Sequence, residues 1–129
     1  MDKINTTIRK SYEVKIFIGS IDESCGMSFT EESIVRLIGE FQDSTIHILP
    51  VRISKTRFIS GVKYDELGWE LSSINFPKIN CWGRSYKSFM IKYMNELAKF
   101  LTLKLNQKRV CVVSPNKTYI HENTKFIKV

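Results

Sequence analysis

Residues 101–113 read LTLKLNQKRVCVV and join the end of a long helix to a short apolar strand. Upstream of them, apolar residues recur at helical spacing, so the sequence predicts a helix over about 84–106. Asn106 suits the end of that helix, because asparagine tolerates the left-handed backbone often found there. The run Arg109–Val113 is apolar after its first residue, which is typical of a central strand in a sheet.

The N-terminal half predicts a strand and then a shorter helix. Apolar and polar side chains alternate over residues 12–18, which indicates a strand. Apolar spacing predicts a helix over about 30–42, with Ser28 or Thr30 as its N-cap. We expect residues 45–76, between the two helices, to form two or three antiparallel strands.

Within that central region, several shorter elements are expected. Thr45–Val51 is interpreted as a strand, and Pro50 indicates an edge position or a bend near its end. Gly61 and Asp65–Gly68 are interpreted as turns. Trp69–Phe76 alternates again and predicts a further strand.

The complete order of elements predicts the fold class. Thr118–His121 is expected to form the last strand, and residues 122–129 another short strand or a loose end. The order β-α-β-β-(β)-α-β-β is that of an α+β fold, a mostly antiparallel sheet with two helices packed on one face. We expect residues 1–129 to form a single domain, with 1–11 and 122–129 as loose ends. The other sheet face would then be free for a ligand or for another copy of the chain.

Charge is distributed unevenly along the 129 residues. The net charge is +7, but residues 1–50 carry −3 and residues 51–129 carry +10. A positive surface built from the second part favours a phosphate-bearing partner. No signal peptide and no apolar run of about 18 residues are found, so no membrane span is expected. The three cysteines are widely spaced and favour free thiols in a reducing cytosol.

Motifs for catalysis and metal binding are absent from the sequence. Neither His47 nor His121 begins a zinc-binding pattern, so we expect no metal and no cofactor. A nuclease-like set of Asp65, Glu70 and Lys63 has unspecific spacing, and a solvated hairpin tip explains it better. We therefore expect a protein that is not an enzyme.

Two basic segments are the candidate phosphate-binding sites. Arg57 beside Phe58 offers a guanidinium group next to an aromatic ring, and Arg52 lies on the same segment. The alternative is an edge strand that charge protects against aggregation. Lys108 and Arg109 lie between the second helix and the following strand, where they could bind phosphate or only face the negative end of the helix dipole.

Further candidates would contact the base or its polar groups. Trp82 beside Gly83 could be a stacking surface near the N-terminus of the second helix, or a core residue that covers the end of the sheet. Phe58 and Phe76 are the other candidate stacking residues. Asn106 and Thr118 complete the set as polar contacts.

The order of these features resembles the phage Thoeris anti-defence 1 proteins. The resemblance rests on a strand that ends Phe17-Ile18-Gly19, on Arg57 after the 45–50 strand, and on a helix end, Leu105-Asn106-Gln107, that leads directly into Arg109–Val113. It implies a protein that binds and sequesters glycocyclic ADP-ribose made by TIR-domain enzymes, and so blocks bacterial immune signalling. Arg57 and Arg109 are the phosphate ligands that it implies.

The resemblance also implies partners and a location. It implies that the chain forms a homo-oligomer built from dimers, with a hexamer as one form. It also implies a second site that binds cyclic oligonucleotides. The location is the cytoplasm of an infected or lysogenic bacterial host, with no membrane partner. The alternative function is a basic RNA- or DNA-binding module, whose binding would weaken steeply with salt. A nucleotide-directed enzyme that uses His47, His121 or the Asp65 and Glu70 pair is the third hypothesis.

Overall fold

The computed structural model describes residues 3–6, 8, 10–61, 64–74 and 86–127. Its elements are β1 (Glu13–Gly19), α1 (Glu31–Asp43), β2 (Arg52–Ser60), β3 (Tyr64–Ile74), α2 (Tyr86–Lys104), β4 (Arg109–Val113), β5 (Thr118–Glu122) and a short 3-10 helix, η1 (Thr124–Phe126). The predicted α+β fold and the predicted order of strands and helices are confirmed. Among the described residues, no helix combines the length and apolar character needed to cross a membrane.

Within those residues, five strands form one antiparallel sheet in the order β2-β3-β1-β4-β5. β1 lies in the middle, paired with β3 from Glu13↔Ile74 to Gly19↔Gly68 and with β4 around Ile16↔Val112. The apolar strand β4 is therefore an interior strand, as its composition indicates, but β1 is the central one.

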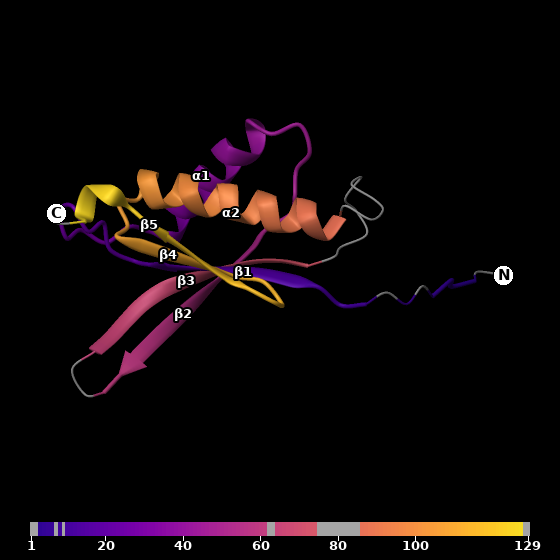
Figure 1. The fold of residues 1–129 in the computed structure, drawn as a ribbon, viewed down its shortest axis with the longest axis horizontal. Helices are drawn as coiled ribbons and strands as arrows, with labels where there is room; N and C mark the ends of the chain where they lie inside the picture. The colour runs from indigo at the N-terminus through magenta and orange to yellow at the C-terminus, as the bar shows by residue number, and fades with distance from the viewer. Residues whose placement is uncertain (1–2, 7, 9, 62–63, 75–85, 128–129) are drawn as a thin grey trace.

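Both helices pack on the same face of the sheet (Figure 1). Alternate residues of β1 point under them, and Val14, Ile16 and Ile18 are all at most 2% exposed. The helices contribute a matching apolar layer of fully or largely buried side chains, namely Ile34, Leu37, Ile38, Met90, Met94, Leu97 and Leu101. Each such side chain contributes about 1.5–3 kcal/mol through burial, so this layer holds the fold together.

The helix ends follow the sequence signals. Thr30 caps α1, because its hydroxyl accepts a hydrogen bond from the Ser33 N–H at 3.3 Å. Beyond α2, Asn106 adopts a left-handed backbone with φ 48°, as expected for a residue that ends a helix. The chain then turns, and the Gln107 N–H donates to the Thr102 carbonyl at 3.0 Å. This turn directs the chain from α2 into β4.

The predicted strand Thr45–Val51 is wrong. The Thr45 hydroxyl donates to the Gln42 carbonyl at 2.8 Å, so the start of this segment is hydrogen-bonded to the last turn of α1. Leu49 is buried there, whereas Ile46 is 94% exposed, and Pro50 has no N–H to donate to a neighbouring strand. The segment is an irregular connection, and the buried side chain of Leu49 holds it against the core.

The predicted turn at Asp65–Gly68 is also wrong, because these residues belong to β3. They pair with β2 and form a long hairpin that projects beyond the rest of the sheet (Figure 1). A glycine is needed at position 68 because β1 and β3 approach closely there. A Cβ on Gly68 would lie 2.5 Å from the Ile18 carbonyl oxygen. The other expected turn position, Gly61, lies just after β2 with φ 74°.

Candidate ligand site on the uncovered sheet face

The face of the sheet opposite the helices carries both charged and aromatic side chains. Because β1 side chains alternate, burial of Val14 and Ile16 directs Lys15 and Phe17 to the other face. Glu70 on β3 lies opposite Phe17 in the β1–β3 register. The aromatic rings of Phe17 and Phe58 meet edge to face, with centroids 6.0 Å apart.

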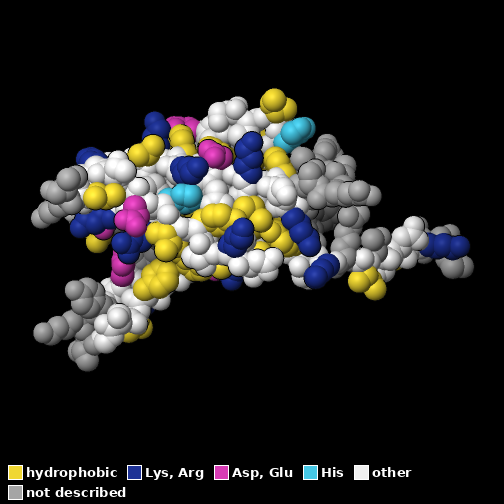
Figure 2. Space-filling view, in the orientation of Figure 1, with side chains coloured by type: hydrophobic (Ala, Val, Ile, Leu, Met, Phe, Trp, Pro, Cys, Tyr) yellow, Lys and Arg dark blue, Asp and Glu magenta, His cyan; other side chains and the backbone are white. Residues whose placement is uncertain are grey.

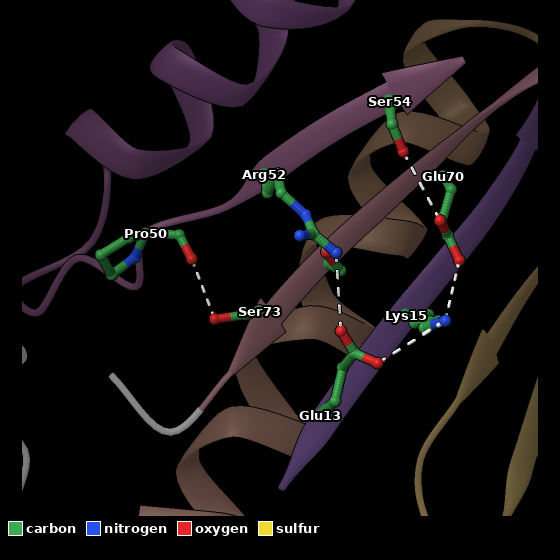
Figure 3. A network of polar contacts seen from close by, with 8 residues as sticks. Glu13, Lys15, Pro50, Arg52, Ser54, Glu70 and Ser73 are labelled. Carbon is green, nitrogen blue, oxygen red and sulfur yellow. Dashed lines mark hydrogen bonds and ion pairs between the residues drawn. The ribbon is translucent and has the colours of Figure 1, made fainter. Parts of the chain in front are cut away.

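A lysine between two carboxylates lies at the centre of this face (Figure 3). Lys15 Nζ lies 3.1 Å from Glu70 Oε1 and 3.6 Å from Glu13 Oε1. The hydrogen bond to Glu70 is the main cause that raises the pKa of Lys15, and the negative charges of Glu13 and Glu70 add to it. The ammonium group is therefore held in its charged form.

An arginine and two serines extend the same network (Figure 3). Arg52 Nη2 lies 3.7 Å from Glu13 Oε2, and its Nε donates to Ser72 Oγ at 3.2 Å. Ser54 Oγ donates to Glu70 Oε2 at 3.5 Å. The face thus presents a connected set in which two carboxylates offset two cations, and these groups are partly accessible to solvent.

A hollow of about 780 Å³ lies beside the network. It is lined by Ser11, Tyr12, Glu13, Lys15, Phe17, Ile74, Val113, Ser114 and Pro115. Its volume lies within the range of about 300–1,000 Å³ that is usual for small-molecule sites. The aromatic ring of Phe17 offers a face for a flat base, and Lys15 and Glu13 provide charged groups at its edge. The hollow therefore combines a stacking surface with charged groups.

Tyr12 is held at one end of this hollow by a cation–π contact with α2. Lys87 Nζ lies 5.2 Å from the centroid of its ring. Partial burial is the main cause that raises the pKa of the Tyr12 hydroxyl. The phenol is therefore neutral near pH 7, and its ring lies against α2 and the core.

The candidates from the first basic segment are divided between the two faces of β2. Arg52 and Phe58 lie on the uncovered face, Arg52 in the network and Phe58 against Phe17. Arg57 faces the opposite way and forms a two-pronged ion pair with Asp65, in which Nε donates to Oδ1 at 2.5 Å and Nη2 donates to Oδ2. Hydrogen bonding to Asp65 raises the pKa of Arg57. Arg57 and Phe58 are not brought together to bind one ligand.

The candidates after α2 lie at the far end of β1. Arg109 Nη2 lies 3.9 Å from Glu122 Oε2, and the Lys108 N–H donates to the Glu23 carboxylate. The Asn106 side chain is already used, since its Nδ2 donates to Asp22 Oδ2 at 3.0 Å. That bond and the bonds from Ser24 lower the pKa of Asp22 to about 2, the Ser24 side chain having the largest effect.

The remaining described candidates do not line the hollow beside Lys15. Thr118 is exposed at the start of β5, opposite Val113. Trp82 and Phe76 lie outside the described residues. His121 has a structural partner, because its Nε2 lies 2.7 Å from Asn95 Oδ1 on α2, and burial lowers its pKa. Lys63 of the nuclease-like set lies outside the described residues, and Asp65 pairs with Arg57.

Reasoning from the sequence did not single out Lys15, Glu13, Tyr12 or Phe17. The available signal was the alternation of β1, which places charged residues on one face of a strand whose other face is apolar. Glu70 was considered only with Asp65, whereas its partners are Lys15 and Ser54. Only the register between β1, β2 and β3 brings these residues together.

Comparison with known proteins identifies neighbours by fold alone. No family model matches the chain, and no curated protein matches it. Two solved structures share its fold. One is a phage SAM lyase in complex with S-methyl-5′-thioadenosine, with TM-score 0.65, 13% identity, and coverage of 98% of this chain and 100% of that chain. The other is a phage SAM lyase in the apo state, with TM-score 0.65, 17% identity, and coverage of 94% and 97%.

These neighbours correct one expectation and leave another untested. Both are named as lyases, so the expectation that the chain is not an enzyme is contradicted. The neighbours are phage proteins, as the resemblance implies, but the comparisons do not show the Thoeris anti-defence 1 family itself. The named ligand, S-methyl-5′-thioadenosine, shows that a neighbour of this fold holds a small nucleoside.

Proposed function

We propose that this chain is a phage protein that binds a small adenosine-containing ligand and cleaves S-adenosylmethionine. The observation that carries the proposal is the shared fold over the whole of both chains, with a neighbour that holds S-methyl-5′-thioadenosine. The hollow on the uncovered face of the sheet supports it, because its size and lining suit a nucleoside.

Each part of the site has a role in this proposal. The ring of Phe17 stacks against the adenine ring. Glu13 and Glu70 stabilise the positive sulfonium, and the Lys15 ammonium binds the carboxylate of the substrate. A set of mixed charges suits S-adenosylmethionine, which itself carries both cationic and anionic groups.

The chemistry needs no second reactant. When the bond between sulfur and the aminobutyryl carbon breaks, its electron pair stays on sulfur and neutral S-methyl-5′-thioadenosine leaves. The four-carbon part closes a ring through its own carboxylate, which forms the new C–O bond at the same carbon. Opposite charges disappear in this step, so surroundings less polar than water favour it.

The alternative ligand is the cyclic ADP-ribose signal that the Thoeris resemblance implies. A diphosphate requires cations that lack carboxylate partners. Both arginines of β2 already have such partners, in the pairs Arg52–Glu13 and Arg57–Asp65. On the side seen in Figure 2, basic side chains are also scattered among apolar ones. These observations favour S-adenosylmethionine over a diphosphate ligand or nucleic acid.

We further propose that copies of the chain assemble in the cytoplasm of an infected bacterial host, as dimers or as a hexamer built from dimers. The uncovered face exposes Phe58, Ile74 and Ile120 at 43%, 48% and 57%. A face with this much accessible apolar surface is suited to contact with another copy. A native mass spectrum that contains only monomer at micromolar concentration would contradict assembly.

The test of the lyase proposal is product formation. Purified protein is incubated with S-adenosylmethionine, and S-methyl-5′-thioadenosine is measured by chromatography and mass spectrometry. We expect product in proportion to protein, and a loss of about 10²-fold or more in Glu70→Gln, because an electrostatic contact to the reacting group is removed. Glu96→Gln is the matched control, since Glu96 is an exposed carboxylate on α2 that pairs with Lys99.

Two outcomes would overturn the proposal. One is a folded protein that gives no S-methyl-5′-thioadenosine and does not bind it. The other is depletion of free glycocyclic ADP-ribose, with intact recovery after heating and no cleavage of S-adenosylmethionine. In that case the cyclic signal would be the ligand.

A further inference from the structure

A second hollow lies at the other end of β1, around Gly19. Its volume is about 400 Å³, and it shares no lining residue with the hollow beside Lys15. Its lining is Gly19, Glu23, Glu66, Gln107, Lys108, Arg109, Glu122, Asn123, Phe126 and Ile127. We call it the rim hollow. Its walls combine three carboxylates, two cations and an apolar end.

Two acceptor oxygens converge in front of Gly19. A Cβ at Gly19 would lie 2.8 Å from Glu66 Oε1 and 3.3 Å from Gln107 Oε1. Because Gly19 has no side chain, no atom attached to it fills the space between these two oxygens. A ligand nitrogen in this space could donate to Glu66 and Gln107 together.

The Gln107 oxygen is fixed toward this space. The side chain of Gln107 is only 3% exposed, and its Nε2 donates to the carbonyls of Ile21 at 2.7 Å and Leu105 at 3.1 Å. Rotating the amide would place its oxygen against these two carbonyls, so the orientation is determined. Across the described parts of the chain, neither Gln107 Oε1 nor the Glu66 carboxylate accepts a hydrogen bond. Both oxygens are therefore open to a donor that enters the hollow.

Cationic groups face the same hollow. Arg109 approaches Glu122 only at 3.9 Å and its side chain is 63% exposed, so most of its five N–H donors are free to bind a ligand. Lys108 adds an exposed ammonium group. One of the carboxylates, Glu23, is engaged by the Lys108 backbone N–H.

The charge pattern selects the class of ligand. A phosphate would face the carboxylates of Glu23, Glu66 and Glu122, which disfavours an anion. Within the described residues, no group of His, Cys, Asp or Glu could hold a metal ion. A ligand that carries both an ammonium group and a carboxylate suits this pattern. Its ammonium group would donate to the Glu66 and Gln107 oxygens, and its carboxylate would accept from Arg109. Phe126 and Ile127 would contact an apolar side chain.

We propose that the rim hollow binds a free α-amino acid with an apolar side chain, because unpartnered Glu66 and Gln107 oxygens converge over Gly19 opposite the donors of Arg109. The ammonium lies between these oxygens, and the carboxylate lies on the guanidinium. This site is separate from the proposed lyase site.

The test uses L-methionine as the probe and an NMR titration of the ¹⁵N-labelled full chain. We expect saturable shifts of the Gly19 amide and the Gln107 side-chain amide signals. N-acetyl-L-methionine lacks the ammonium and L-methioninamide lacks the carboxylate, so each should bind about tenfold or more weakly, since each loses a charged hydrogen bond.

Two variants test the residues. Glu66→Gln should weaken L-methionine about tenfold and should bind N-acetyl-L-methionine as the wild type does. Gly19→Ala places a methyl group against both acceptor oxygens and should abolish binding. Glu40→Gln, an exposed carboxylate on α1, is the matched control. Amide spectra of both variants establish that they are folded.

Several results would overturn the proposal. These are equal binding of L-methionine and N-acetyl-L-methionine, unchanged binding in Glu66→Gln, or shifts confined to Tyr12 and Phe17. Cleavage of S-adenosylmethionine should be unchanged in Glu66→Gln, so the failure of one proposal can be distinguished from the failure of the other.

Discussion

The two faces of β1 differ sharply although their residues alternate along one strand. On the covered face, Val14 and Ile16 are fully buried against the helices. On the uncovered face, Lys15 and Phe17 are half-buried and border a hollow. The strand thus contributes to stability through one set of side chains and to ligand binding through the other. Substitutions of neighbouring residues should therefore have different kinds of effect.

The largest effect is expected on the covered face. Ile16→Ala removes a fully buried side chain at the centre of the sheet and leaves a cavity under α2. We expect a loss of about 2–5 kcal/mol in the free energy of unfolding, measured by urea denaturation. A loss below about 1 kcal/mol would show that the covered face is not the main source of stability.

The fold was largely predictable from the sequence because local periodicity reports burial directly. The alternation of residues 12–18 and the helical spacing of 30–42 correspond to β1 and α1, and Thr30 and Asn106 end their helices as expected. The first part of β3 was missed because Gly68 is locally typical of a turn. Its actual role depends on the Ile18 carbonyl of a different strand.

The second prediction tests that role of Gly68. Gly68→Ala places a Cβ 2.5 Å from the Ile18 carbonyl oxygen, which is backbone and cannot rotate away. We expect a loss of about 1–3 kcal/mol in stability, because β1 and β3 must move apart. Thermal unfolding measures the loss, and Gly39→Ala on α1 is the control, since a Cβ there meets nothing within 4 Å. Equal melting temperatures for the two variants would contradict the close approach.

The site was less predictable because register, which local sequence does not reveal, assembles it. Arg57 looked free to bind phosphate, but pairing across the hairpin places it against Asp65. Lys15 and Glu70 are distant in sequence and meet only because β1 pairs with β3. Lys108 and Arg109 were selected for position, and both line the rim hollow.

The third prediction concerns the uncovered face. Phe17→Ala removes a half-buried ring that contacts Phe58 and borders the hollow beside Lys15. We expect binding of S-methyl-5′-thioadenosine to weaken by about 1–3 kcal/mol through lost stacking. The loss of stability should be smaller than in Ile16→Ala. Calorimetric titration measures the affinity, and unchanged affinity would remove Phe17 from the proposed site.

The smallest effect is expected for Lys15→Met, and its pH dependence is its signature. Glu70 and Glu13 raise the pKa of Lys15 above its ordinary value of 10.5 in the folded state, so the folded state holds the proton more tightly. The contribution of Lys15 to stability is therefore fully present below pH 10.5 and is lost as the pH rises through the folded-state pKa. Wild type should melt slightly above the variant at pH 7, and this gap should close in alkaline solution. A gap that stays constant to high pH would mean that packing of the lysine stem, rather than its charge, holds Lys15 between the two carboxylates.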